Sequence, residues 1–294
     1  MAIVVNTNIE SLKVQRNLNA ATTKMSTAIE RMTTGYKINS AADDCAGLVI
    51  SKGLEAQQRG SVIAQNNAQT GINLLQTAEG TLDVIQTHLL RIRDLTLQAM
   101  NGGYSETEVK AMEDEAIARA QEINRISGAA KFNEFELFPE NADNSLILQI
   151  GAQSDKDRNT IAVSGVFKSA TISSLLGATA SIKFTSAATN SAGTTTRTKL
   201  PDDDFRTLLD EIDKGINEIS TRRGTIGAIS NRLTSAIDQL SIQNENLTAA
   251  KSRIMDADIG TESSNYTQYS ILQQASASLL TQANQAPSIA LSLI

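Results

Sequence analysis

Aromatic residues, proline, cysteine and histidine are all scarce in this chain of 294 residues. Aromatics make up 3% of it, tryptophan is absent, and there are three prolines, one cysteine and one histidine. Because aromatic side chains bury the largest areas, so few of them argue against one large globular core. A single cysteine excludes an intramolecular disulfide framework, and a single histidine excludes metal sites with several histidine ligands. Because an interior proline costs a helix about 3 kcal/mol, the long proline-free runs favour long helices.

A basic excess and a long apolar run are also missing. The formal net charge is −6, which argues against a protein dedicated to nucleic acid. No stretch approaches the roughly 18 apolar residues of a membrane span, so no membrane insertion is expected. The first residues, MAIVVNTNIESLK, have no basic region and do not resemble a conventional signal peptide. We find no glycine-rich phosphate loop and expect no cofactor and no enzyme activity.

Apolar residues recur every seven positions along 203–255. Such a heptad pattern predicts a long coiled-coil helix, and its polar positions can fix register and partner. An ordinary core stripe is the alternative, although such stripes rarely run so long. The uniform row consists of Ile212, Ile219, Ile226, Leu233, Leu240, Leu247 and Ile254. The mixed row lies three residues earlier, at Leu209, Ile216, Arg223, Ser230, Ile237, Asn244 and Lys251.

The N-terminal third carries similar stripes. They predict helices over 44–100 and 106–128, which together with 203–255 suit an antiparallel bundle. The first stripe consists of Ala64, Ala68, Gly71, Leu75, Ala78, Leu82, Ile85, Leu89 and Ile92. The second consists of Val109, Met112, Ala116, Ile123 and Ile126.

The residues between these two helices indicate a helix stop and restart. Gly102 or Gly103 is expected to take the left-handed cap conformation, and Ser105 is expected to cap the next helix together with Glu108. Glycines inside the first helix cost about 1 kcal/mol each relative to alanine. They mark either the close approach of a helix or of another subunit, or tolerated sequence drift. These glycines are Gly47, Gly53, Gly60, Gly71 and Gly80.

Residues 129–202 have a different character. Short strands are predicted at 146–150, 160–163 and 181–185. Residues 185–198 are rich in serine, threonine, alanine and glycine. The segment therefore predicts a small β-hairpin region with a polar, exposed tip, too small for an independent catalytic domain.

The two chain ends, 9–34 and 261–286, are predicted to be amphipathic helices with small or soft side chains along one seam. Burying such modest side chains stabilises the two ends by less free energy than the conformational entropy of ordering them costs. We therefore expect the two chain ends to be loose until they pack against each other and against copies of the chain. The first seam consists of Val14, Leu18, Ala21, Met25, Ala28 and Met32. The second consists of Tyr269, Leu272, Ser276, Leu279, Ala283 and Ala286. The fold class is therefore mainly α, a long antiparallel helical bundle or coiled coil from both chain ends with a small β-hairpin insert in mid-sequence.

Several long segments at both ends resemble bacterial flagellin. The N-terminal ones are TNIESLKVQRNLNA at 7–20, AIERMTTGYKINSA at 28–41, INSAADDCAGLVIS at 38–51 and LLRIRDLTLQAMNG at 89–102. KFNEFELF at 131–138 and LQIGA at 148–152 are similar to later family motifs. AAKSRIMDADIGTESSNYT at 249–267 and ANQAPSIALSLI at 283–294 match the C-terminal signature. The resemblance covers about 1–163 and 205–294.

The resemblance implies a domain organisation. Residues 1–42 and 257–294 would be the paired inner-core helices of a flagellar filament, and 43–165 with 204–256 would be the surrounding helical tube, with short β-hairpins near 131–165. Residues 166–203 would be a short, exposed variable insert.

The resemblance also implies partners and a location. The chain would be a structural subunit of the extracellular filament that drives swimming, exported unfolded through the flagellar type III apparatus without a cleaved signal. Partners would be copies of itself, a cap protein, hook-junction proteins and an export chaperone. That chaperone would bind Leu291, Leu293 and Ile294. In the interface between subunits we expect Leu18, Met25, Met32, Tyr269, Leu272 and Leu279.

Family members are also sensed by a vertebrate Toll-like receptor. Arg91, Leu95 and Glu115 match positions that contact this receptor, and contacts between subunits are the alternative role for Arg91 and Glu115. The serine- and threonine-rich tip is a candidate for O-linked sugars, with an unmodified loop as the alternative.

Other polar residues have simpler interpretations. Asp43 and Asp44 precede an apolar run and are expected to cap a helix, with an intersubunit salt bridge as the alternative. Cys45 is expected to be a small buried or interfacial residue. His88 is expected to be a solvated helix residue rather than a ligand. The Asp202-Asp203-Asp204 run is better explained as a helix start than as a metal site.

Three alternative functions remain open at this point. A hook–filament junction protein belongs to the same family, although both terminal signatures are complete here. A signalling coiled coil would be expected to turn back in mid-sequence, where this chain has a β-like insert. A secreted hydrolase would need a pocket that no motif supplies.

Overall fold

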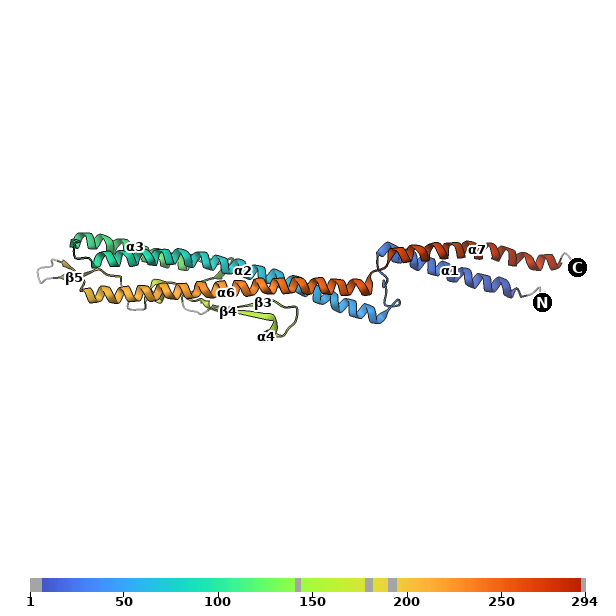
Figure 1. Ribbon diagram of the computed structural model, residues 1–294, viewed down its shortest axis with the longest axis horizontal. Helices are drawn as coiled ribbons and strands as arrows, with labels where there is room; N and C mark the ends of the chain where they lie inside the picture. The colour runs from blue at the N-terminus through green and yellow to red at the C-terminus, as the bar shows by residue number, and fades with distance from the viewer. Residues whose placement is uncertain (1–6, 141–143, 178–181, 190–194, 292–294) are drawn as a thin grey trace. The chain divides into compact units, whose positions relative to one another are not determined.

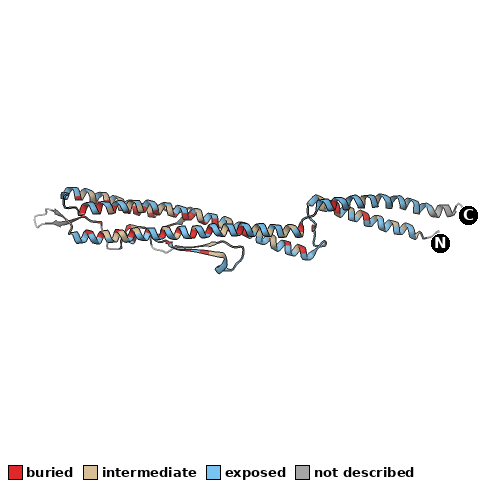
Figure 2. Ribbon diagram, in the orientation of Figure 1, coloured by how far each residue is buried: buried red, intermediate tan, exposed pale blue. Residues whose placement is uncertain are grey.

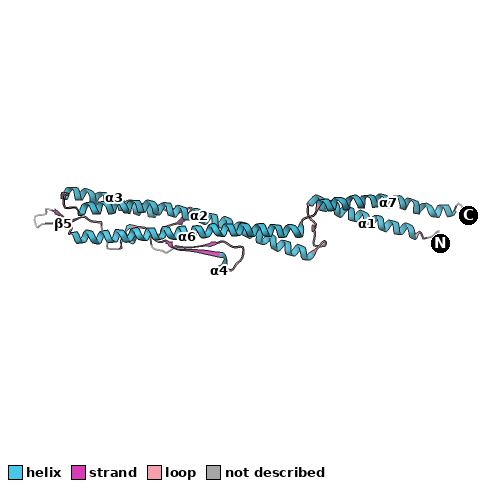
Figure 3. Cartoon of the chain, in the orientation of Figure 1, coloured by secondary structure: helices cyan, strands magenta, loops and turns pink. Residues whose placement is uncertain are grey.

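The computed structural model describes residues 7–140, 144–177, 182–189 and 195–291. Most of these residues are helical, with short hairpins between α3 and α6 (Figures 1 and 3), which confirms the mainly α fold class. The helices are α1 (Ile9–Thr34), α2 (Cys45–Met100), α3 (Glu106–Ala129), α4 (Lys156–Asn159), α5 (Ile172–Leu176), α6 (Asp202–Met255) and α7 (Ile259–Leu291). The strands are β1 (Lys131–Phe132), β2 (Phe135–Glu136), β3 (Asn144–Gln149), β4 (Thr160–Phe167), β5 (Thr185–Thr189) and β6 (Thr195–Lys199).

The chain divides into two compact units. One consists of Met1–Arg59 with Asn244–Ile294, and the other of Gly60–Gln243. The breaks between helices lie elsewhere, at 35–44 and 256–258.

In the unit Gly60–Gln243, α2, α3 and α6 share one hydrophobic core. All nine residues of the stripe expected on α2 are buried, and buried positions recur at regular intervals along the helices (Figure 2). On α6 the uniform heptad row is buried from Ile212 to Leu240, as predicted. Ion pairs also join α2 to α6, with Arg93 Nε 2.6 Å from Asp213 Oδ1 and Arg223 Nη1 2.8 Å from Asp83 Oδ1.

The second buried row on α6 lies one residue before the mixed row that the heptad pattern predicts. Leu209, Ile216 and Ile237 are only half-buried. The second buried row consists of Leu208, Gly215, Arg222 and Ile229. The cause is a third partner that periodicity does not reveal, because the segment after β4 covers this side of α6. Arg222 Nη1 donates to the carbonyl oxygens of Lys168 and Ser169 at 2.9 and 3.1 Å.

The link between α2 and α3 is partly as predicted. Ser105 and Glu108 form the expected capping box, in which each side chain accepts a hydrogen bond from the other residue's backbone N–H. The expectation of a left-handed Gly102 or Gly103 is wrong, because neither has a positive φ. The helix end is instead bound by Lys199, whose ammonium donates to the carbonyl oxygens of Met100 and Asn101.

The hairpin of β3 and β4 explains two of the helical glycines. A Cβ atom on Gly60 would lie 2.6 Å from Ala152 Cβ, and one on Gly71 would lie 2.5 Å from Leu148 Cδ1. The segment that approaches these two glycines is therefore a hairpin of the same chain, and not the helix or other subunit that was expected. Gly53 and Gly80 face open space.

The expectation that 166–203 is an exposed insert is wrong for much of its described part. Phe167 packs edge-on against Phe135, and Phe184 packs against Phe205, with ring centroids 5.7 and 5.6 Å apart. The third strand also begins later than predicted, at Thr185, and Ile182 and Phe184 before it are buried. Further buried residues of this segment are Val166, Ala170, Ile172, Leu175, Leu176 and Ile182.

Candidate functional site: the terminal helix pair

Helix α1 has a well-defined beginning and end. The Asn8 side chain accepts a hydrogen bond from the Ser11 backbone N–H at 3.0 Å, which satisfies one of the free donors of the first turn. At the other end Gly35 takes a left-handed conformation with φ 76°, and its N–H donates to the Arg31 carbonyl.

Helix α7 begins after Asp258. The Asp258 carboxylate accepts hydrogen bonds from the Gly260 backbone N–H at 2.9 Å and from the Thr261 hydroxyl at 2.9 Å. Hydrogen bonds from Thr261, chiefly that of its hydroxyl, hold the pKa of Asp258 below its usual value. The carboxylate therefore stays ionised at the positive end of the helix dipole.

The seam between α1 and α7 combines small, polar and half-buried apolar side chains. Ala21 and Ala28 are buried, and Leu18, Met25 and Met32 are half-buried as the predicted seam requires. On α7, up to residue 285, the least exposed positions are Glu262, Asn265, Tyr269, Ser270, Gln273, Ser276, Leu280 and Ala283.

Two residues expected on the α7 seam do not lie on it. Leu272 is 45% exposed and Leu279 is 53% exposed. Alternating steps of four and three from Tyr269 lead inward through Gln273, Ser276 and Leu280, and these leucines lie one residue before two of those positions. Apolar side chains are spread around α7, so its periodicity does not identify which row faces α1.

A set of hydrogen bonds and one ion pair, which we call the polar ladder, fixes the register of the two helices. The ladder joins Asn8 Nδ2 to the Ala283 carbonyl at 2.8 Å, Ser11 Oγ to Asn284 Oδ1 at 2.7 Å, Thr22 Oγ1 to Gln273 Nε2 at 3.1 Å, and Arg31 Nη1 to Glu262 Oε1 at 3.2 Å. The step from Ser11 to Thr22 equals the step back from Asn284 to Gln273, so these rungs describe one antiparallel register.

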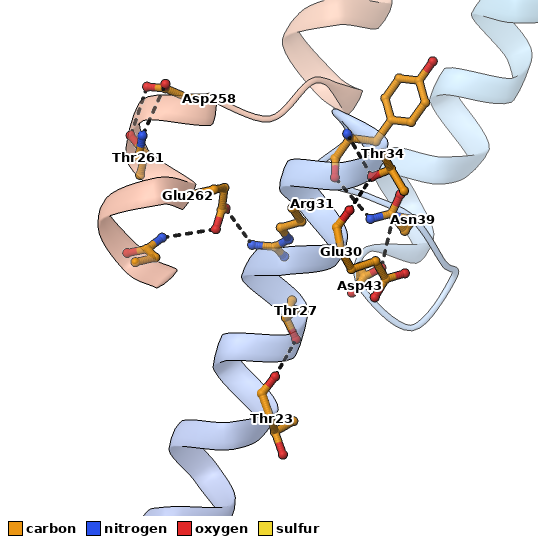
Figure 4. A network of polar contacts seen from close by, with 12 residues as sticks. Thr23, Thr27, Glu30, Arg31, Thr34, Asn39, Asp43, Asp258, Thr261 and Glu262 are labelled. Carbon is orange, nitrogen blue, oxygen red and sulfur yellow. Dashed lines mark hydrogen bonds and ion pairs between the residues drawn. The ribbon is translucent and has the colours of Figure 1, made fainter. Parts of the chain in front are cut away.

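Further polar contacts lie at the junction where α1 ends and α7 begins (Figure 4). The Lys37 N–H donates to the Met255 carbonyl at 2.6 Å, and the Ala257 N–H donates to the Gly35 carbonyl at 2.8 Å. Glu262 is 8% exposed and also accepts a hydrogen bond from Asn265. The Arg31–Glu262 pair is therefore the least solvated rung.

Asp43 and Asp44 have different roles in the turn before α2. Asp44 Oδ1 accepts from the Gly47 N–H at 3.0 Å and caps α2 as predicted. Asp43 instead accepts from the backbone N–H groups of Asn39 and Ser40, and these bonds, Ser40 first, lower the pKa of Asp43. A salt bridge from either residue to another subunit stays a prediction.

Cys45 and His88 differ from their simplest interpretations. Cys45 is exposed within the chain, so the expectation that it is buried is wrong and an interfacial role stays a prediction. His88 is half-buried, and its Nδ1 lies 3.3 Å from Arg119 Nη1, so it is less solvated than predicted. Asp202, Asp203 and Asp204 form the first turn of α6, as the helix-start interpretation requires.

The three receptor-type positions are not equivalent. Leu95 is 2% exposed, so the expectation that it offers a contact surface is wrong for this conformation. Arg91 binds Glu115 through two hydrogen bonds, at 3.0 and 3.2 Å. The Arg91 guanidinium is the main cause of a lowered pKa for Glu115. Leu291 ends α7 with its side chain outside the described residues, and Leu293 and Ile294 lie outside them entirely.

Apolar side chains remain uncovered on both terminal helices. On α1 they are Ile9, Leu12 and Ile29. On α7 they are Ile259, Tyr266, Ile271, Leu272 and Leu279. Exposed apolar residues this numerous on one pair of helices indicate a surface for association. We call this set the outer apolar face, although its members lie at several positions around α7. The sequence identifies its leucines as apolar but does not show that they lie outside the row that faces α1.

Two further properties of the described part of the chain concern membranes and metals. None of its helices is long and apolar enough to cross a membrane. Among the same residues, no three histidine, cysteine, aspartate or glutamate side chains come close enough together to hold a metal ion.

Long paired helices with an uncovered apolar face define a class of structural proteins that associate through their helices. Models of two flagellin regions match this chain: the bacterial flagellin N-terminal helical region at residues 5–143, and the C-terminal helical region at 209–294. Flagellin of Bacillus subtilis (strain 168) is 36% identical over 99% of both chains. Flagellin of Halalkalibacterium halodurans is 34% identical over 99% of this chain and 100% of that one. The crystal structure of Bacillus cereus flagellin has 28% identity and a TM-score of 0.45, covering 63% of this chain and 94% of that one.

The chain belongs to the bacterial flagellin family. It is a structural subunit of the extracellular flagellar filament and not an enzyme. Its partner in that filament is itself, because flagellin self-assembles into a polymer.

Proposed function

We propose that this chain polymerises by burying the outer apolar face of α1 and α7 between neighbouring copies. The observation that supports the proposal is the exposure of Leu272 and Leu279, which lie beside the row of α7 that faces α1. Burying the exposed half of one such leucine is worth about 0.8–1.5 kcal/mol, so several of these residues per subunit together stabilise association. The predicted seam residues Leu18, Met25, Met32 and Tyr269 would act indirectly, by holding the pair that presents this face.

In this proposal residues 1–42 and 257–294 form the inner core of the filament, and 43–165 with 204–256 form the tube around it. The exposed outer tip would then consist of the hairpin of β5 and β6 and not of the whole segment 166–203, because the segment before this hairpin is packed into the core. A contact repeated by a helical operator, in which one surface binds a different surface of the next copy, gives an open polymer.

Export and accessory partners extend the proposal. The chain would leave the cell unfolded through the flagellar type III apparatus without a cleaved signal, and the absence of a disulfide framework suits that route. A chaperone would bind Leu291, Leu293 and Ile294 before export, while a cap protein would direct folding at the growing end and hook-junction proteins would join the filament base. Sensing by a Toll-like receptor would use Arg91 and Glu115 and would require their ion pair to open.

Seeded polymerisation tests the proposed function. Purified chain is added to short filament fragments, and growth is followed by light scattering and negative-stain electron microscopy. We expect long filaments that extend from the seeds. A chain that stays monomeric over a wide range of concentration and salt would contradict the proposal and favour the junction-protein or signalling-coil alternatives.

A further inference from the structure

The short link between α2 and α3 contains an Asn101-Gly102 pair in an unusual chemical setting. Asn101 follows the last residue of α2, and Asn101, Gly102 and Gly103 are all exposed. No atom outside the immediate chain neighbours lies within 4 Å of where a Gly102 Cβ would be. Neither a side chain on residue 102 nor a packed neighbour beside it therefore hinders the approach of the Gly102 nitrogen to another group.

Two hydrogen bonds polarise the groups around this pair. Asn101 Oδ1 accepts from the Gly103 N–H at 3.2 Å, which draws electron density away from the side-chain amide carbon. Lys199 Nζ lies 3.3 Å from the Asn101 carbonyl oxygen and 3.0 Å from that of Met100. The Lys199 ammonium also lies 5.7 Å from the centre of the Phe205 ring, so the aromatic face helps to hold it in place.

The geometry points to Asn101 as a site of spontaneous modification, in which Lys199 promotes cyclisation of the Asn101-Gly102 pair to a succinimide. The Gly102 nitrogen gives its proton to solvent and forms a bond to Asn101 Cγ. The bond from Cγ to Nδ2 breaks, and the departing nitrogen takes a proton and leaves as ammonia. Water then opens the ring at either carbonyl, giving aspartate or isoaspartate. The net reaction consumes one water and releases one ammonia, with no oxidant or reductant.

Lys199 is placed to assist the first step. When the Gly102 nitrogen loses its proton, the negative charge of that peptide group is shared with the Asn101 carbonyl oxygen, which is the oxygen that Lys199 contacts. When the ring closes, Asn101 Oδ1 takes up a negative charge. The Gly103 N–H already donates a hydrogen bond to this oxygen and would stabilise that charge. Fixed donors at atoms where charge develops lower the barrier.

The modification would change the end of α2 permanently. It adds one negative charge at the C-terminal end of a helix, where the dipole disfavours it, although Lys199 lies close by. The isoaspartate product also inserts a methylene group into the backbone of the link. Older subunits would therefore differ chemically from newly made ones at this point.

The test compares the full chain with three variants during incubation at mildly alkaline pH. Peptide mass mapping follows replacement of the amide by an acid at Asn101, and enzymatic methyl transfer counts isoaspartate. The unmodified chain should convert at Asn101. Lys199→Met should slow this by about three- to tenfold, as expected for loss of one charge-assisted hydrogen bond, while Lys199→Arg should react like the parent. Gly102→Ala should react more slowly than the parent, because its methyl group hinders ring closure.

Either of two results would overturn the proposal. One is the absence of conversion at Asn101 in the unmodified chain. The other is a Lys199→Met variant that converts as fast as the parent or faster, since Lys199 would then restrain the link without promoting the reaction. Circular dichroism of each variant shows that the fold is retained, so a changed rate reports on the link itself.

Discussion

Replacing both Leu272 and Leu279 by glutamate should stop filament growth in the seeded assay. Each leucine is about half exposed in the chain, so the folded subunit itself should lose little stability. About half of each leucine is already covered in the chain, so in the polymer each change removes about 0.8–1.5 kcal/mol of burial. Each change also adds a charge whose desolvation costs several kcal/mol. Together these terms exceed 3 kcal/mol, which corresponds to at least a hundredfold weaker association.

The matched control keeps the apolar character at the same two positions. Leu272→Met with Leu279→Met should retain growth close to that of the parent, because methionine fills a similar volume and tolerates irregular packing. Growth of the double glutamate variant at the parental rate would contradict the outer apolar face as an interface.

Reversing the charge of Glu262 should separate the terminal helices. Glu262→Arg places a second guanidinium against Arg31 at a position that is 8% exposed, where an unpaired charge is expensive. The apolar side chains of the rest of the seam, such as Leu18 and Met25, are only half-buried, so they oppose separation weakly. We expect lower helical content by circular dichroism and loss of seeded growth.

The swapped pair is the informative control for this change. Arg31→Glu combined with Glu262→Arg restores opposite charges across the helices and should recover part of the helical content and growth. Recovery should be incomplete, because glutamate at the end of α1 and arginine at the start of α7 both oppose the helix dipoles, at about 0.3–1 kcal/mol each. A swap that behaves like the single reversal would show that this rung does not set the register.

The sequence predicted the helices of this fold well because their signals are local. Stripes such as Leu75 to Ile92 repeat with the helical period, and Ser105 with Glu108 forms a cap within four residues. The second row on α6 could not be placed in the same way. Arg222 and Gly215 are buried by the segment that follows β4, which is distant in sequence and carries no periodic signal.

The candidate site was less predictable for a related reason. The sequence shows that Leu272 and Leu279 are apolar. It does not show which side of α7 faces α1, because that depends on the polar ladder. Its rungs pair residues more than 200 positions apart, such as Arg31 with Glu262. The position of Arg31 in the last turn of α1 and of Glu262 in the first turn of α7 is the one available signal, since a tight antiparallel connection brings these turns together.

Amide hydrogen exchange of the terminal helices, in the monomer and in the filament, tests most directly whether α1 and α7 complete their packing only between copies. Helices with few buried apolar contacts open readily, so amides of 9–34 and 259–291 should exchange quickly in the monomer, while those of 64–99 stay protected. In the filament the terminal amides should become as protected as the core of the other unit. Unchanged exchange of α1 and α7 on polymerisation would contradict the account.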